Sequence, residues 1–450
     1  MSDRLLDLAT QIVEKARARG APIAEAVATQ SRELSAKVRL GRTELVEEAA
    51  SLSVGLRIID DARSGTAYTS DTSASGIEAL VDDGLELARL SEPDPFSVPP
   101  EPDLLAKAQP ELDLFDAEVE AIDATQAIEL ARRTEAAARA FDPRISNSEG
   151  ASFTRSIGGY ALVTSGGFSG SYRGTSCGLS MEPVAEDRDG KKQRGSYWDS
   201  RRYFRDLASA EEIGREAARR TVSKLGARNV PTARVPVVFQ PDAARALLSL
   251  LLSSVYGSAI YRRASYLCDR EGTEVASPLV EIVDDPLIRR GTGSRPFDGE
   301  GLPSRKNVVV ERGVLRTYLL DCYSARKLGR ASTGNASRGA GSAPTVSATN
   351  LVLLPGDRPP EAIIREVDRG LFVSSMMGFG FNAVTGDFSR GAEGFWIEGG
   401  ELGQAVSEVT VSLGFNDLWR RIDAIGNDLD TRSRLATPTL RVSEMTVAGR

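Results

Sequence analysis

Two kinds of hydrophobic periodicity follow one another in the first half of the chain, and their order constrains the fold more than any other feature. Residues 5–16 carry apolar side chains three and four positions apart, which is typical of one face of a helix. Apolar and polar residues then alternate over residues 34–40 and again over residues 52–58. Strict alternation indicates antiparallel strands with one buried face. The sequence therefore predicts an α+β fold.

The same order of elements recurs after a segment that cannot form a core. A helix with a capping box at Ser75 and Glu78 is expected to run to about Leu90, and an acidic, proline-rich loop follows over residues 91–111. Beyond this loop come a helix, a set of glycine- and serine-rich strands and another helix. We therefore expect residues 1–230 to form an N-terminal α+β domain with a duplicated helix–strands–helix unit.

Residues 231–450 form a second predicted domain, which is dominated by antiparallel β-sheet. One hairpin is expected to turn at Glu311-Arg312-Gly313 and another at Gly399-Gly400, where a positive φ costs glycine little. Short helices are expected between these strands. The whole chain is thus a predicted two-domain α+β protein.

Composition narrows the class of protein and its location. The net charge is −7, which argues against a surface dedicated to nucleic acid. The longest apolar run, residues 247–252, is shorter than the roughly 20 residues that span a bilayer, and the first residues lack the apolar core of a signal peptide. The three cysteines are far apart and form no metal knuckle. We expect a cytoplasmic protein without membrane contact.

Histidine is absent from the chain, and this absence removes the most common catalytic arrangements. A Ser-His-Asp triad, a Cys-His pair and an imidazole metal site are all excluded. The G-x-S-x-G match around Ser176 lies within predicted strands and has no base beside it. Ser324 and Lys327 have S-x-x-K spacing, but the elements that accompany this motif in serine hydrolases are missing. From the residues alone, no catalytic machinery is predicted.

The C-terminal half nevertheless resembles a known family, the TldD/PmbA family of peptidase-related proteins. Six segments carry the resemblance, in this order: SPLVEIVDDP (277–286), FDGEG (297–301), GVLRTYLLDCYSARKLG (313–329), STGNASR (332–338), TGDFSRGAEGFWIEGGEL (385–402) and GNDLDTRS (426–433). The combination of YSARK with SRG and FW is similar to the PmbA (TldE) branch in particular.

The resemblance also places a metal site of the family on this sequence. In the TldD branch, a His-Glu-x-x-x-His box on the helix after the first C-terminal strand binds a metal, with a further Cys near the C-terminus. The corresponding positions here are Ser249, Leu250 and Ser254, with Thr437 in place of the Cys. Serine hydroxyls are poor zinc ligands and leucine cannot act as a base. The resemblance therefore implies no catalytic residues, metal or cofactor in this chain.

Family membership would imply a role beside a catalytic partner. A PmbA-type chain pairs with a TldD-type metalloprotease subunit, which holds zinc or a similar metal, and the pair cuts unfolded or leader peptides. The expected contacts to substrate or partner are Asp387, Ser389, Arg390, Phe395 and Trp396, although core packing is an equal alternative for Phe395 and Trp396. Exposed strand edges beside GFWIEGG (394–400) could hold an extended peptide by β-augmentation.

Two other functions stay open at this point. The chain could be a self-contained homodimeric hydrolase that uses serine or carboxylate chemistry, and a homodimer is also expected when the chain is alone. It could instead be a peptide-binding or scaffolding protein without a protease partner. A proteolytic assay on the purified chain and a peptide-binding assay without a partner separate these alternatives.

Overall fold

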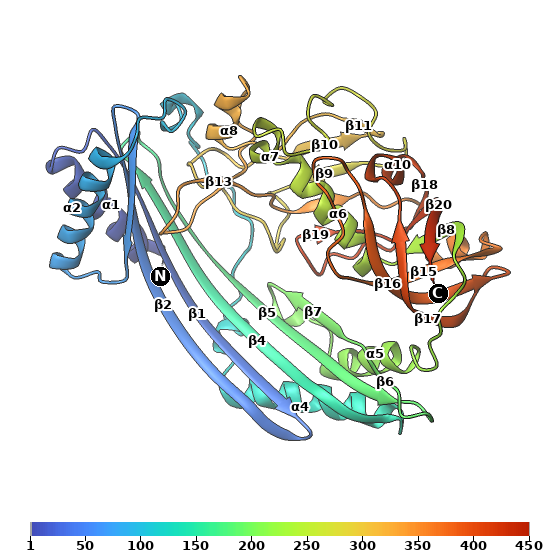
Figure 1. Ribbon diagram of the computed structural model, residues 1–450. Coiled ribbons are helices and arrows are strands. Elements are labelled where there is room, and N and C mark those ends of the chain that lie inside the picture. Colours follow the sequence, from blue (N-terminus) through green and yellow to red (C-terminus); the bar gives the residue numbers. More distant parts are fainter. Residues whose placement is uncertain (1, 450) are drawn as a thin grey trace.

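The computed structural model describes residues 2–449, whose strands form one large sheet in the N-terminal part and three sheets in the C-terminal part (Figure 1). The N-terminal part contains, in chain order, α1 (Ser2–Ala18), β1 (Ile23–Arg39), β2 (Arg42–Asp60), β3 (Arg63–Thr69), α2 (Ala74–Leu90), the 3-10 helix η1 (Pro102–Leu104), α3 (Ala117–Ala121), α4 (Ala124–Phe141), β4 (Ile145–Thr164), β5 (Ser169–Glu186), β6 (Lys192–Arg194), β7 (Tyr197–Arg201), η2 (Phe204–Asp206) and α5 (Ala210–Val222).

The C-terminal part has shorter elements. They are β8 (Ala233–Phe239), α6 (Pro241–Val255), α7 (Gly257–Tyr261), β9 (Ile282–Asp284), β10 (Asn307–Glu311), β11 (Val314–Leu315), α8 (Cys322–Lys327), β12 (Ala336–Ser337), β13 (Thr345–Val346), β14 (Leu351–Leu353), α9 (Pro360–Arg365), β15 (Arg369–Met377), β16 (Ser389–Glu398), β17 (Glu401–Ser412), α10 (Phe415–Arg420), β18 (Ile422–Ile425), β19 (Leu435–Ala436) and β20 (Leu440–Ala448).

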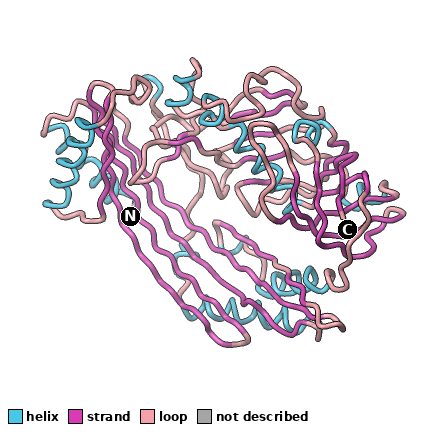
Figure 2. The backbone as a smooth tube through the Cα atoms, viewed as in Figure 1, coloured by secondary structure: helices cyan, strands magenta, loops and turns pink. Residues whose placement is uncertain are grey.

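Four unusually long strands form the centre of the N-terminal sheet. Strands β1, β2, β4 and β5 have 17, 19, 20 and 18 residues, whereas strands of globular proteins commonly have about 3–10. The strand order is β3-β2-β1-β4-β5-β6, with β7 beside β5, and all pairs are antiparallel. Figure 2 shows these strands crossing the whole N-terminal part.

All four long helices of the N-terminal part pack on one face of this sheet. Helices α1 and α2 share a core with Ala26 and Leu56, and helices α4 and α5 share a second core with Leu34 and Phe153. Ala26 and Leu34 are an even number of residues apart on β1, so their side chains point to the same side of the sheet. The two helix pairs therefore lie at opposite ends of a single face (Figure 1).

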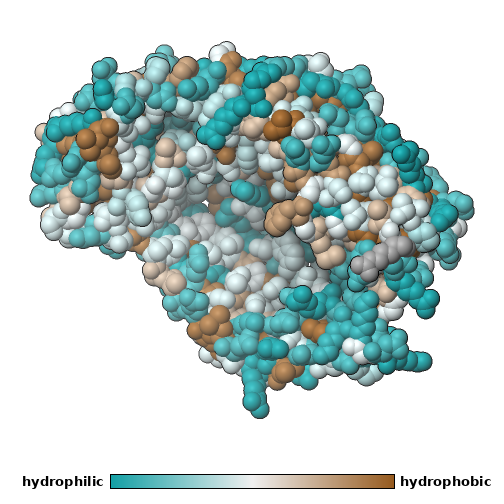
Figure 3. Space-filling view, viewed as in Figure 1, coloured by the Kyte–Doolittle hydropathy of each residue, from teal (hydrophilic) through white to brown (hydrophobic). Residues whose placement is uncertain are grey.

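The opposite face of the sheet packs against the C-terminal part. Val27, Leu162 and Phe168 lie on or beside the sheet and form a cluster with Phe297 of the C-terminal part. The ring centroids of Phe168 and Phe297 are 4.8 Å apart. Figure 3 shows that the surface is hollowed between the long strands and the C-terminal part.

The predicted α+β architecture with mainly antiparallel sheets is confirmed. The order α1-β1-β2-β3-α2 recurs as α4-β4-β5-β7-α5, with the short strand β6 added in the second series. The predicted capping box at Ser75 is wrong: the N-cap of α2 is Ser73, whose side chain accepts a hydrogen bond from the Gly76 amide at 3.1 Å. Ser73 lies in extended conformation immediately before the helix, which is the geometry of an N-cap.

Five strands of the C-terminal part form a closed ring of pairings. The strand order is β17-β16-β15-β8-β20-β18, and β17 also pairs with β20, so that β18 alone lies outside the ring. The pairs are antiparallel except for β15 with β8. Both predicted hairpins are present, at Arg312 and Gly313 between β10 and β11 and at Gly399 and Gly400 between β16 and β17.

The proline-rich loop lies on the C-terminal part. Within residues 91–111 the structure has only the short helix η1. Arg326 of α8 donates hydrogen bonds to the carbonyl oxygens of Val98 and Pro99 at 2.6 and 2.5 Å. Tyr323 donates to Asp94 Oδ2 at 2.8 Å. Among residues 2–449, no helix is long and apolar enough to cross a bilayer.

Candidate functional site

Helix α6 carries the positions at which the TldD-type metal box would lie. Pro241 is its first residue and Asp242 lies in its first turn, which are both favourable at a helix N-terminus. A stripe of leucines, Leu247, Leu248 and Leu251, is buried in the core of the C-terminal part. Apolar side chains at this spacing cover one face of the helix. The helix is therefore a core helix with one accessible side.

The two serines at the metal-box positions, Ser249 and Ser254, lie on different sides of α6. Ser249 is exposed, whereas Ser254 is fully buried. Positions five residues apart are about 140° apart around a helix, which accounts for this difference. The Ser254 hydroxyl donates to the carbonyl oxygen of Leu250 at 2.9 Å within the helix. Leu250 is half-buried and packs against the core.

Thr437 lies at the other end of the same helix. Its side chain is fully buried, and its hydroxyl donates to the carbonyl oxygen of Pro241 at 2.8 Å. Pro241 is about two helical turns before Ser249. The structure thus brings Thr437 to the first turn of α6, and no hydrogen bond joins it to Ser249 or Ser254 within the described residues.

These four positions do not fit a zinc ion. The hydroxyls of Ser254 and Thr437 already donate hydrogen bonds to backbone carbonyl oxygens, and Ser249 is exposed. Leu250 has no polar atom in its side chain. Zinc in proteins takes thiolate, imidazole or carboxylate ligands. Within residues 2–449, no group of three cysteine, aspartate or glutamate side chains is arranged to hold a metal ion. We therefore derive no metal-dependent step for this chain.

The first turn of α6 belongs instead to an ion-pair network. Arg245 contacts Asp242 Oδ1 at 2.9 Å and Asp430 Oδ2 at 2.6 Å. Arg432 contacts the same two carboxylates, Asp242 at 3.1 Å and Asp430 at 2.6 Å. Burial opposes ionisation of Asp242, but the charges of Arg432 and Arg220 outweigh burial and lower the pKa of its carboxyl. Charged pairs of this kind hold the helix end in a fixed position.

The network also joins the two parts of the chain. Arg220 of α5 contacts Asp242 Oδ2 at 2.8 Å, and Arg432 donates to the carbonyl oxygen of Trp198 on β7 at 2.6 Å. The Arg432 guanidinium lies 4.7 Å from the ring centroid of Tyr197. This site was not predicted from the sequence, because its charged residues, Arg220, Asp242 and Arg432, lie far apart along the chain. The i, i+3 spacing of Asp242 and Arg245 was its only local signal.

A cleft of about 1100 Å³ opens beside the network, between the two parts of the chain. Glu182, Arg194 and Arg219 line it from the N-terminal part, and Arg245, Ser375 and Phe395 line it from the C-terminal part. The lining thus mixes charges of both signs with an aromatic ring. Of the five predicted contact residues, only Phe395 lies in this cleft.

The predicted strand edge beside GFWIEGG is not open, which corrects the expectation of β-augmentation there. Strand β16, which carries Phe395 and Trp396, pairs with β15 on one side and β17 on the other. An open edge lies nearby on β15 instead. Strand β8 pairs with β15 only at Leu371–Val373, and the Gln240 amide donates to the Ser374 carbonyl oxygen at 2.5 Å. Ser375–Met377 therefore have no strand partner on the cleft side among the described residues.

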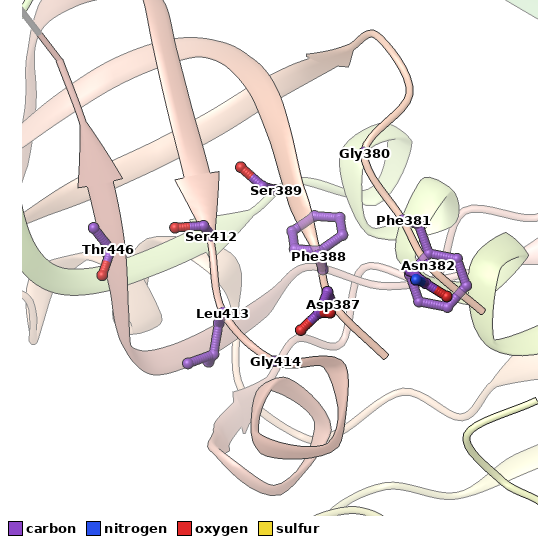
Figure 4. Close-up of a pocket in the computed structure, with 10 residues that line it drawn as sticks. All are labelled: Gly380, Phe381, Asn382, Asp387, Phe388, Ser389, Ser412, Leu413, Gly414 and Thr446. Carbon is purple, nitrogen blue, oxygen red and sulfur yellow. The ribbon is translucent and has the colours of Figure 1, made fainter. Parts of the chain in front are cut away.

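The other predicted contact residues lie in different surroundings. Asp387 and Ser389 are exposed and line a shallow hollow of about 630 Å³ (Figure 4). Arg390 is half-buried. Trp396 is only 6 % exposed and packs in the core of the C-terminal part, so the core-packing alternative applies to it. The structure brings Asp387 and Ser389 together and separates them from Phe395.

The two short motifs with catalytic spacing form no site. Ser176 lies within β5 and pairs with Ser156 of β4, in a run of strands as the sequence indicates. Ser324 is 1 % exposed, and its hydroxyl donates to Asp321 Oδ1 at 2.5 Å. Lys327 lies 4.1 Å from the ring centroid of Phe96, and no hydrogen bond joins it to Ser324 among the described residues. Each motif is explained by local packing.

Comparisons with known proteins agree with this architecture. Three family models match: PmbA/TldA metallopeptidase domain 1 over residues 24–88, the central domain over residues 117–225 and the C-terminal domain over residues 232–449. The metalloprotease PmbA of Escherichia coli O157:H7 is 35% identical over 427 residues, which are 95% of this chain and 92% of that protein. A TldD homologue of Haemophilus influenzae is 24% identical over 88% of this chain and 86% of its own length.

A solved structure shows the same fold along the whole chain. The structure of a candidate modulator of DNA gyrase from Bacteroides thetaiotaomicron superposes with a TM-score of 0.92 and 28% sequence identity, covering 99% of this chain and 98% of that one. The family models together cover most of the chain, and the PmbA of Escherichia coli O157:H7 matches 95% of it. This chain belongs to the PmbA/TldD metallopeptidase family.

Proposed function

We propose that this chain is the non-catalytic subunit of a TldD/TldE-type metalloprotease that cuts unfolded or leader peptides. The observation that carries the proposal is the state of α6. A member of a metallopeptidase family has Ser249, Leu250 and Ser254 where the metal box would lie, and its sequence contains no histidine. In the proposed pair, zinc or a similar metal is held by the TldD-type partner.

The interdomain cleft supports a role in holding the peptide. An unfolded peptide is extended and carries unsatisfied backbone N–H and C=O groups, which an open strand edge can pair. Residues Ser375–Met377 of β15 offer such an edge inside the cleft, beside Phe395. The mixture of Glu182, Arg194 and Arg219 opposite this edge provides charges of both signs for polar side chains of a peptide.

The remaining parts of the proposal concern location and partners. The cysteines at positions 177, 268 and 322 form no disulfide, which agrees with the reducing cytoplasm as the site of action. The net charge of −7 supports a peptide substrate over direct contact with nucleic acid. The partner is a chain with the His-Glu-x-x-x-His box from the same cell.

The experiment is a reconstitution with metal analysis. This chain and the TldD-type chain are purified separately and together, and each sample is assayed for transition metals and for cleavage of an unfolded peptide. We expect metal only in samples with the partner, and cleavage only in the mixture. A mixture in which the partner's box Glu is replaced by Gln serves as the inactive control. Chelator-sensitive cleavage by this chain alone, or full cleavage by the partner alone, contradicts the proposal.

A further inference from the structure

Three carboxyl side chains, those of Asp298, Glu300 and Asp321, lie close together in the interior of the C-terminal part. They are 1%, 6% and 4% exposed. None of them forms an ion pair within the described residues, and no acidic group there is arranged to hold a metal ion. Three buried negative charges without a counter-charge would repel one another strongly, so a proton must neutralise at least one of these carboxyls.

The hydrogen bonds assign this proton to Glu300. Asp298 accepts hydrogen bonds from three backbone amides at 2.9, 2.9 and 3.1 Å. Asp321 accepts from an amide and a hydroxyl of α8 at 2.8 and 2.5 Å. Glu300 accepts from Cys322 alone, whose amide nitrogen lies 2.8 Å away. Because donors stabilise the charged form of a carboxylate, Glu300 is the member of the group that is most easily protonated.

The ionisable groups around Glu300 agree with this assignment. Burial raises the pKa of Glu300 to about 8, and the charges of Asp298 and Asp321 contribute to the rise. Burial also raises the pKa of Asp298, but the Arg295 guanidinium opposes that rise. Burial and the charge of Glu300 raise the pKa of the Cys322 thiol far above neutral. Glu300 is thus the group that can change its charge near neutral pH.

Glu300 supports the first residue of helix α8. Cys322, whose amide it accepts, begins this helix and is buried together with Ala325 on its inner side. The helix has only six residues, and so short a helix has little stability of its own. The position of α8 therefore depends on contacts such as the one between Glu300 and Cys322.

The outer side of α8 holds residues 91–99, the segment after α2, which we call the strap (Figure 1). Tyr323 donates to Asp94 Oδ2 at 2.8 Å. Arg326 donates to three carbonyl oxygens of the strap at 3.1, 2.6 and 2.5 Å. Lys327 Nζ lies 4.1 Å from the centroid of an aromatic ring of the strap. Three side chains of one short helix thus bind the strap to the C-terminal part.

The same strap is bound to the N-terminal sheet. The Asp94 amide donates to the carbonyl oxygen of Ala62, between β2 and β3, at 2.8 Å. Arg57 of β2 donates to the carbonyl oxygen and the hydroxyl of Ser97 at 3.1 and 2.9 Å. Asp94 therefore contacts the N-terminal part through its amide and Tyr323 of α8 through its carboxylate. The strap joins the two parts of the chain through α8.

We propose that Glu300 and α8 form a pH-sensitive latch on the strap: when Glu300 loses its proton, α8 shifts and releases the strap from the C-terminal part. An ionised Glu300 faces the charges of Asp298 and Asp321 in an interior that water does not reach. Repulsion and the need for hydration both favour an open position of α8, in which the carboxylate meets solvent. The junction between the two parts is then looser above neutral pH than below it.

The direction of the pH dependence follows from proton linkage. In the closed state the pKa of Glu300 is about 8, whereas in the open, hydrated state it returns to the ordinary 4.5. Between these values the closed state holds a proton that the open state has released. The equilibrium constant for opening therefore rises with pH up to about 8 and is constant above that value.

Hydrogen exchange followed by mass spectrometry tests the latch in the full chain. Exchange rates of peptides from the strap, α8 and α4 are divided by the intrinsic rate at each pH, which gives an opening constant. For the wild type, the constants of the strap and α8 should rise together by at least about 10-fold from pH 6 to pH 8. Glu300→Gln keeps an acceptor for Cys322 but cannot ionise, and should remove this rise. The exposed Glu311→Gln is the matched control and should keep it.

Two further measurements show whether the opening is local and whether α8 transmits it. Urea below the unfolding transition should leave the opening constants of the strap and α8 unchanged and raise that of α4, because a local opening exposes little surface. Arg326→Gln removes three hydrogen bonds to the strap, and should open the strap by at least about 5-fold at every pH. The pH dependence of α8 should persist in this variant.

Any other result overturns the proposal. A wild-type profile without pH dependence means that Glu300 does not control the strap, and this measurement decides even if Glu300→Gln does not fold. A rise that persists in Glu300→Gln identifies a different titrating group. If α8 opens while the strap stays protected, the helix does not hold the strap. If both exchange only as slowly as α4 and with its urea dependence, the chain has no local opening at this position.

Discussion

The Arg338 guanidinium donates a hydrogen bond from Nη1 to Glu25 Oε2 at 2.7 Å, and thereby connects the C-terminal part to the first strand of the N-terminal sheet. Arg57 on the neighbouring strand contacts the same carboxylate oxygen at 3.2 Å. All three side chains are at most 5% exposed. One carboxylate thus balances two buried cations at the junction.

Glu25→Gln is expected to destabilise the protein by about 3–5 kcal/mol, because it leaves two buried arginines without a counter-charge. Burial alone would raise the pKa of Glu25, but Arg57 and Arg338 outweigh it and lower the pKa below the ordinary 4.5. The contribution is therefore present at neutral pH and is lost as the pH falls through the lowered value. Urea denaturation at neutral pH measures the effect, with the exposed Glu33→Gln as the control on the same strand. Equal stability of the two variants would contradict it.

Glu300 is expected to give the opposite dependence on pH. Burial, together with the charge of Asp298, raises its pKa from 4.5 to about 8. Between these values the folded state holds a proton that the unfolded state has released, so the free energy of unfolding falls as the pH rises. Glu300→Gln keeps an acceptor for the Cys322 amide, which lies 2.8 Å away, and should flatten this dependence. Denaturation curves across the window test this, with the exposed Glu311→Gln as reference; parallel profiles for wild type and Glu300→Gln would refute it.

Leu251→Asp is expected to destabilise severely, by more than about 4 kcal/mol, because it places an unpaired charge in the core. Leu251 is 2% exposed on α6. Ser253→Asp, at an exposed position of the same helix, should unfold close to the wild-type temperature. Thermal denaturation followed by circular dichroism compares the two. Similar melting temperatures would mean that the leucine face is accessible.

Single histidine substitutions at the two serines of the metal-box positions should affect stability unequally. Ser249→His is expected to be tolerated, because position 249 is exposed. Ser254→His should cost about 1–3 kcal/mol, because a larger ring must enter a fully buried position. The double variant should bind no stoichiometric zinc, because position 254 is fully buried and Thr437, whose hydroxyl already donates to the Pro241 carbonyl oxygen, supplies no further ligand. Metal analysis after equilibration with zinc and desalting decides; about one ion per chain would overturn the expectation.

Charge reversal at Asp387 or Arg390, two of the expected partner contacts, should affect pairing and leave folding intact. Asp387→Arg or Arg390→Glu is expected to abolish peptide cleavage by the reconstituted pair, since reversing a charge at an interface commonly costs several kcal/mol. Asp82→Arg on α2, an exposed charge in the N-terminal part, is the control. Complex mass and cleavage rate are measured for each mixture. If Asp387 only stabilises its own turn through Thr385, its variant will melt earlier and pair normally.

The local elements could be predicted from the sequence because their signals are local. The turn at Gly399 and Gly400 follows from residues that permit positive φ, and the alternation over residues 52–58 indicates β2 directly. The same reasoning failed at Ser75, because Ser73 lies only two residues earlier and offers the same hydroxyl. Choosing between neighbouring caps depends on where the preceding turn ends.

Long-range features could not be predicted in this way. The contact between Asp242 and Arg432 joins residues far apart in the sequence. Nothing in the neighbouring sequence distinguishes either residue from a charged residue that is exposed to solvent. The interior position of β16 depends on β15 and β17 pairing with it on opposite sides, which periodicity does not reveal. For the same reason the sequence suggested an open edge at Phe395 and Trp396, although the open edge lies on β15.

The closure of the C-terminal ring has a consequence for biosynthesis. Strand β8, the first of the ring to leave the ribosome, pairs with β20, whose residues 440–448 are synthesised some two hundred residues later. Local elements can form during translation, but a pairing of such high sequence separation waits for its second strand. Until then β8 and the free edges of the ring stay exposed. The face of the N-terminal sheet that packs against the C-terminal part is exposed with them. We therefore expect chaperones that bind unpaired strands to bind the nascent chain of this protein.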